Sequence, residues 1–109
     1  MLSKSPSPHA IAADWPSSAV LVVDDEEGMR NFLVKTLAPR CGQVLAAGSA
    51  EAGEALVRQQ RFDLLILDIS LPGKRGLDWL RELREQGHSC AVILITAFAD
   101  LDTAIEALR

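Results

Sequence analysis

Apolar residues gather in four short runs along the chain, and amphipathic stretches separate these runs. The runs cover residues 19–23, 44–47, 64–67 and 91–95. Runs this short and without alternation are typical of strands buried on both faces, as in a parallel sheet. The stretches that follow the runs carry apolar residues at helical spacing, and they cover residues 28–37, 50–61, 76–87 and 101–109.

The helical spacing also predicts which side chains face the core. In the first three helices the expected inward residues are Met29, Phe32, Leu33, Thr36 and Leu37, then Ala52, Ala55 and Leu56, then Leu77, Leu80 and Leu83. Ser49 is a candidate N-cap for the second helix, because a hydroxyl there can accept a backbone N–H bond. We expect Trp79 to flank the third stripe as a partly exposed aromatic side chain.

The regular alternation of strand and helix predicts an α/β fold, a doubly wound parallel sheet with helices on both faces. Because crossover connections are right-handed, few topologies remain, and the flavodoxin-like order 2-1-3-4-(5) fits best. A fifth strand and a fifth helix are expected to be absent from this chain. Residues 19–109 form the predicted domain, and the Ser- and Pro-rich residues 1–18 are expected to be a disordered leader.

Composition excludes several classes of protein. With 109 residues, a net charge of −4 and a pI near 5.0, the chain is one domain at most and has no nucleic-acid surface. No apolar run is long enough to span a membrane, and the N-terminus has no secretory signal. Cys41 and Cys90 lack metal-type spacing, so we expect reduced thiols in a cytoplasmic protein.

Acidic residues and a threonine recur at the ends of three predicted strands. Asp24 and Asp25 follow the first run, Asp68 follows the third and Thr96 follows the fourth. In an open α/β sheet these ends meet at the edge where ligands bind. Crowded carboxylates resist ionisation unless a cation joins them, and oxygen ligands suit Mg²⁺. An N-cap role explains Asp24 or Asp25 alone, but it does not explain the recurrence at three strands.

A metal held by carboxylates beside a partly free aspartate is typical of a phosphoryl-acceptor site. The metal neutralises the incoming phosphoryl group, and aspartate is a known nucleophile for it. The hydroxyl of Thr96 and the backbone N–H of Ala97 are candidate donors to the phosphoryl oxygens. The sequence therefore predicts a site in which positioning and charge neutralisation do most of the chemistry.

These motifs resemble the receiver domain of two-component response regulators. The resemblance rests on DD after the first strand, D-x-x-x-P-G after the third and T-A after the fourth, and it runs from about Val20 to Arg109. It implies that Asp68 is the phosphoacceptor, with a sensor histidine kinase as the partner that supplies the phosphoryl group. Such a domain catalyses only its own phosphorylation and dephosphorylation, so we do not expect an enzyme in the ordinary sense.

The same resemblance assigns roles around Asp68. Asp25 would bind Mg²⁺ directly, Asp24 would bind it through water, and the backbone carbonyl of Ser70 would be a third protein ligand. Thr96 would be the switch hydroxyl that closes onto the phosphoryl group, and the N–H of Ala97 would contact it.

The stretch TAFADLDTAIEAL looks most like the receivers of nitrogen-regulator-type transcription activators, which carry their output domains further along the chain. The chain departs from the family pattern because it lacks the Lys that ends the family's fifth strand. Neither Lys35 nor Lys74 is placed to replace it. A chain truncated in this way would expose a strand edge, so a homodimer or a swapped assembly is a further hypothesis.

Three alternatives stay open beside the transcription-linked receiver. The chain can be the receiver of a hybrid kinase, or a receiver-like interaction module that no longer takes phosphate. A remote alternative is an Asp-nucleophile phosphatase of the haloacid-dehalogenase type. That class needs D-x-D with its nucleophile on the first strand, whereas this chain has DDEE there and its isolated aspartate, Asp68, follows the third.

Overall fold

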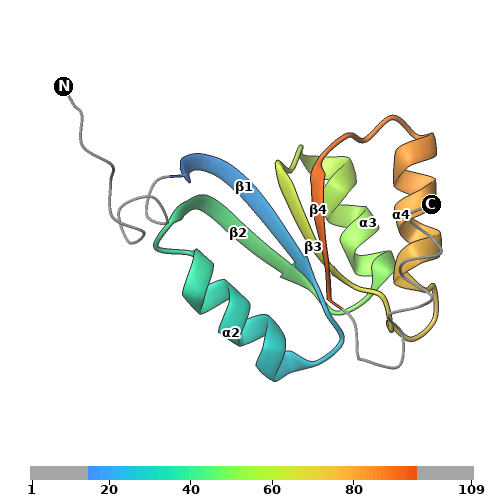
Figure 1. The fold of residues 1–109 in the computed structure, drawn as a ribbon, viewed down its shortest axis with the longest axis horizontal. Helices are drawn as coiled ribbons and strands as arrows, with labels where there is room; N and C mark the ends of the chain where they lie inside the picture. Colours follow the sequence, from blue (N-terminus) through green and yellow to red (C-terminus); the bar gives the residue numbers. More distant parts are fainter. Residues whose placement is uncertain (1–14, 96–109) are drawn as a thin grey trace.

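The computed structural model describes residues 15–95, which form alternating strands and helices (Figure 1). In chain order the elements are β1 (Trp15–Val23), α2 (Glu27–Leu37), β2 (Cys41–Ala47), α3 (Ala50–Gln59), β3 (Leu64–Asp68), α4 (Gly76–Glu85) and β4 (Ala91–Ile95). The expected alternation is confirmed through the fourth strand. The helix expected at residues 101–109, and most of the expected leader, lie outside the described residues.

The four strands form one parallel sheet in the order β2-β1-β3-β4, as expected. Val23 of β1 pairs with Ala47 of β2 on one side and with Leu67 of β3 on the other. The neighbouring strands therefore end in step, and the loops after β1 and β3 leave the same edge of the sheet. Helix α2 covers one face, whereas α3 and α4 cover the other (Figure 1).

Apolar side chains on both faces of the central strands build two cores. Leu21, Leu65 and Leu67 belong to the larger core, which packs beneath α3 and α4. Val22 and Ile66 belong to the smaller core, against which Leu33 of α2 also packs. Burial on both faces explains why these strands appear in the sequence as unbroken apolar runs.

Strand β1 begins four residues earlier than expected, so Trp15–Ser18 are strand and not leader. The backbone N–H of Trp15 donates to the carbonyl of Arg40 at 3.1 Å, and the pairing with β2 shifts register before Ala19. A proline fits at position 16 because β3 pairs with β1 only from Val20 onward, which leaves this side of the strand unpaired within the described sheet. Apolar patterning misses such a segment because Trp15, Pro16 and Ser17 are exposed and form no apolar run.

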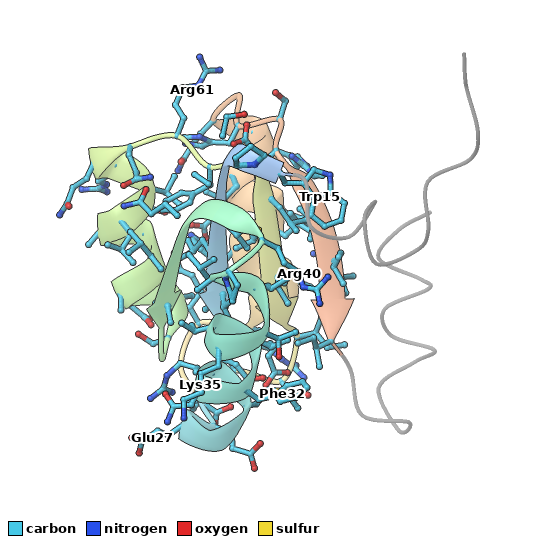
Figure 2. The ribbon with its side chains drawn as sticks, turned by 90° about the vertical axis from the view of Figure 1, so that its left-hand side faces the viewer. Trp15, Glu27, Phe32, Lys35, Arg40 and Arg61 are labelled. Atoms are coloured by element: carbon cyan, nitrogen blue, oxygen red, sulfur yellow. The ribbon has the colours of Figure 1, made fainter. Side chains whose placement is uncertain are left out.

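The inward face of α2 is narrower than expected, and the buried residues of α3 are not the expected ones. Phe32, which is labelled in Figure 2, is 62% exposed, and Thr36 is exposed too. In α2 only a stripe with Leu33 and Leu37 contacts the sheet, so Phe32, one position away, points aside. In α3 the expectation for Ala52 and Ala55 is wrong as well, since both are exposed while Ala50 and Gly53 are the buried positions.

Trp79 lies at the centre of the larger core, so its expected partly exposed position is wrong. Its side chain is 0% exposed, and Leu83 one turn later is also buried. The indole N–H donates to Glu54 Oε1 at 2.8 Å, which gives the buried ring a polar partner. Gly53 of α3 leaves the space that the ring fills.

Cys41 and Cys90 are both free, in agreement with the expected reduced thiols. Among the helices within residues 15–95, none has the length and apolar character needed to cross a membrane.

Candidate functional site

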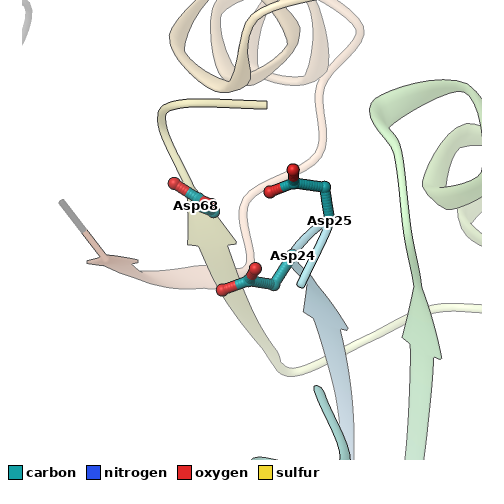
Figure 3. A group of neighbouring side chains, drawn as sticks. All are labelled: Asp24, Asp25 and Asp68. Carbon is teal, nitrogen blue, oxygen red and sulfur yellow. The ribbon is translucent and has the colours of Figure 1, made fainter. Parts of the chain in front are cut away.

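Three carboxylates meet where β1 and β3 end. Asp24 and Asp25 follow β1, Asp68 is the last residue of β3, and Figure 3 shows their side chains gathered at this edge. One ligand oxygen from each lies within 4.8 Å of the others. Val23 of β1 pairs with Leu67 of β3, so the residues that follow these two positions lie side by side at the same edge of the sheet.

Asp24 is held by its backbone as well as by its side chain. Its N–H donates to the carbonyl of Ala47 at 3.1 Å, and its own carbonyl accepts a bond of 2.8 Å from Nη1 of Arg30. Oδ1 accepts from the backbone N–H of Glu26 at 2.9 Å. Although it is a charged residue, Asp24 is only 4% exposed, so its charge faces the cluster with little water around it.

Asp68 is the carboxylate whose protonation the site perturbs. Burial raises the pKa of Asp68 above its usual value, and the negative charges of Asp24 and Asp25 raise it further. The backbone N–H of Ser70 donates to Asp68 Oδ1 at 2.8 Å, and this bond partly offsets the rise. The three acids therefore repel one another in the absence of a cation, as expected from their crowding.

The loop after Asp68 is anchored closely to the end of β3. Ile69 and Leu71 are buried, and Gly73 adopts a positive φ of 72° that favours glycine. At Gly76, the first residue of α4, a Cβ atom would collide with the carbonyl oxygen of Asp68. Only glycine fits there, so the start of α4 and the backbone of Asp68 have a fixed relationship.

The residues present fit a hard divalent cation. All three side chains offer carboxylate oxygens, which are ligands that Mg²⁺ prefers. Burial raises the pKa of Asp68, and the nearby charges of Asp24 and Asp25, which a cation would neutralise, raise it further. Ser70 lies two residues beyond Asp68 and is exposed. The ligand role of the Ser70 carbonyl stays a prediction. Thr96 and Ala97 lie outside the described residues, and β4 is described up to Ile95, which pairs with Asp68.

Sequence reasoning missed one residue of this site, Arg30. It occupies the first half of α2, and in the sequence it looks like any basic residue on the polar side of an amphipathic helix. Its contact is with a backbone carbonyl, and no side-chain motif signals such a bond. The structure alone places it against Asp24.

Comparison with known proteins gives a family match over most of the chain. The family model described as "Response regulator receiver domain" matches residues 20–109. Two curated relatives come from Pseudomonas aeruginosa. The alginate biosynthesis transcriptional regulatory protein AlgB is 37% identical over 90 residues, which are 83% of this chain and 20% of AlgB. The two-component response regulator PhoP is 37% identical over 89 residues, which are 82% of this chain and 40% of PhoP.

A solved structure gives the same result for the fold. The crystal structure of NtrX from Brucella abortus is similar to this chain with a TM-score of 0.78 and 29% identity, over 85% of this chain and 21% of that one. The chain thus spans between a fifth and two fifths of the length of these relatives.

Proposed function

The chain belongs to the response regulator receiver domain family, and on that premise we propose that Asp68 accepts a phosphoryl group from a histidine kinase with the help of Mg²⁺. The observation that carries this proposal is the convergence of Asp24, Asp25 and Asp68 within 4.8 Å at the carboxyl edge of the sheet. Receivers are signalling domains, so the acceptance of the phosphoryl group is the signal. The position of Asp68 at the end of the third strand, and not on the first, speaks against a phosphatase of the haloacid-dehalogenase type.

In the proposed site, Asp25 and Asp68 bind Mg²⁺ directly, Asp24 binds it through water, and the Ser70 carbonyl completes the protein ligands. A bound Mg²⁺ supplies positive charge next to the phosphoryl oxygens. The N–H of Ser70 holds Asp68 Oδ1, which leaves Oδ2 as the proposed nucleophile. Oδ2 forms a bond to phosphorus while the P–N bond of a phosphohistidine breaks, and the electron pair leaves with the imidazole.

The proposed output of this reaction is a shift between two conformations. The hydroxyl of Thr96 and the N–H of Ala97 would bind the new phosphoryl oxygens, and this would favour one conformation of the partner-binding surface. By analogy with AlgB, which is a transcriptional regulatory protein, we propose that the output is transcription activation by a domain elsewhere in the full protein. The cytoplasmic location and the homodimer or swapped assembly stay predictions.

Intact mass tests the phosphoacceptor directly. The full natural protein is incubated with Mg²⁺ and a small phosphodonor such as acetyl phosphate, in parallel with Asp68→Asn and with Asp78→Asn. Asp78 is a suitable control because it is exposed on α4, outside the acidic cluster. We expect one added phosphoryl group in the wild type and in the control, and none in Asp68→Asn or in EDTA. An unmodified wild-type protein would overturn the proposal.

A further inference from the structure

The side chain of Arg30 spans the gap between α2 and the end of β1. Its Nη1 donates to the Asp24 carbonyl at 2.8 Å. Gly48, the residue after β2, leaves room for this side chain, since a Cβ at Gly48 would lie 3.2 Å from Nη1. The guanidinium therefore sits beside three segments at once, which are the end of β1, the first half of α2 and the start of the loop before α3.

The bonded carbonyl belongs to the peptide unit that joins Asp24 to Asp25. This unit is planar, so a bond to its oxygen fixes the direction in which the chain continues to Asp25. A charged donor makes a stronger hydrogen bond than a neutral one, and Asp24 is almost fully buried. The bond from Arg30 thus restricts rotation of the peptide unit between the two carboxylates.

We propose that Arg30 is a positioning residue for the metal site, because it holds the Asp24–Asp25 peptide in the orientation that lets both carboxylates serve one Mg²⁺. This inference rests on the proposed function, since it assumes that the acidic cluster binds Mg²⁺. In this role Arg30 would act through the backbone of Asp24, without contact to the cation or the phosphoryl group. A simple tether between α2 and the sheet would affect stability but not the affinity for Mg²⁺.

Calorimetric titration of Mg²⁺ into the full protein tests the proposal. We expect Arg30→Gln to weaken Mg²⁺ binding about tenfold, a typical loss when a group behind the metal ligands is removed. Arg30→Lys should recover part of the affinity because its ammonium can still donate to the carbonyl. Lys35→Gln is the matched control, since Lys35 is an exposed cation on the same helix (Figure 2) and its loss changes the net charge equally.

Gly48→Ala provides a second perturbation if Arg30→Gln does not fold. The new methyl group would push the guanidinium aside by a few tenths of an ångström and leave all three carboxylates in place, so we expect a smaller loss of Mg²⁺ affinity than in Arg30→Gln. A readout without metal is the exchange rate of the Glu26 amide, which donates to Asp24 Oδ1. We expect this amide to exchange faster with solvent in the metal-free forms of both variants than in the wild type.

The outcomes separate this inference from the proposed function. A wild-type protein that binds no Mg²⁺ would overturn the proposed function itself. The role of Arg30 alone would be overturned if a folded Arg30→Gln bound Mg²⁺ within twofold of the wild-type affinity. If Arg30→Gln does not fold, the same result in Gly48→Ala would overturn it. Equal weakening in Arg30→Gln and Lys35→Gln would also overturn it, because net charge would then explain the loss.

Discussion

The edge of the indole ring of Trp79 packs against Gly53, so that a Cβ at Gly53 would come within 2.7 Å of the ring. Replacing Gly53 by alanine favours the helix by about 1 kcal/mol. Overpacking against a rigid, fully buried ring costs about 1–3 kcal/mol, and we expect this cost to exceed the gain in helix propensity. Gly53→Ala should therefore lower the free energy of unfolding by about 1 kcal/mol in urea denaturation.

A double-mutant cycle identifies the cause of that loss. In a Trp79→Phe background the shorter ring no longer reaches position 53, so Gly53→Ala should cost less there than in the wild type. The explanation is wrong if Gly53→Ala is equally destabilising in both backgrounds, or if it stabilises the wild-type protein.

The hydrogen bond from Trp79 to Glu54 predicts a pH-dependent signal. This bond is the main reason that the pKa of Glu54 is lowered from 4.5, and Arg58 lowers it further. A lowered pKa means that the stabilisation is present above the unfolded value and is lost as pH falls through the folded value. In a Trp15→Phe background, we expect the fluorescence of Trp79 to change with a midpoint below 4.5.

Glu54→Gln is the control for that titration. Its amide oxygen can still accept the indole N–H, but the side chain does not titrate, so the fluorescence change should disappear. A transition that persists in Glu54→Gln would assign the signal to another group or to acid unfolding.

The strand order and the acidic cluster could be predicted from the sequence because each depends on a local pattern. Apolar runs mark strands buried on both faces, and the parallel order then sends the residues after Val23 and Leu67 to one edge. The contact between Gly53 and Trp79 could not be predicted, because it depends on the fit between two helices that are far apart in sequence. The contact of Arg30 with Asp24 could not be predicted either, because the partner of Arg30 is a backbone oxygen.

Ser49 is a local feature that the sequence predicted and the structure confirms. Its Oγ accepts the backbone N–H of Ala52 at 3.1 Å at the start of α3, whereas α2 and α4 begin without a side-chain cap. Ser49→Ala should lower the free energy of unfolding by about 1 kcal/mol in urea denaturation. Ser49→Thr keeps the hydroxyl and should cost much less, so equal losses in both variants would argue against the cap.

Burial of Asp68 and charge repulsion from Asp24 and Asp25 together predict that Asp68→Asn, its neutral isostere, is the more stable protein. The pKa of Asp68 is raised in the folded state above the ordinary value of 3.8, so the folded protein holds this proton more tightly than the unfolded chain. Stability therefore falls as pH rises from 3.8 through the folded pKa, and the ionised carboxylate destabilises the metal-free protein at pH 7. Asp68→Asn removes that charge, and its amide oxygen can still accept from Ser70.

We therefore expect Asp68→Asn to melt above the wild type at pH 7 in EDTA, with the difference vanishing below pH 3.8. Mg²⁺ should reverse the order, because binding to the folded state stabilises by about 2.7 kcal/mol at one hundred times the Kd, and the variant lacks one ligand. Asp78→Asn, which removes an exposed charge 3.7 Å from Arg81, should gain no stability in EDTA and should respond to Mg²⁺ as the wild type does. If Asp68→Asn melts below the wild type in EDTA, then burial and repulsion of the Asp68 charge do not destabilise the metal-free protein.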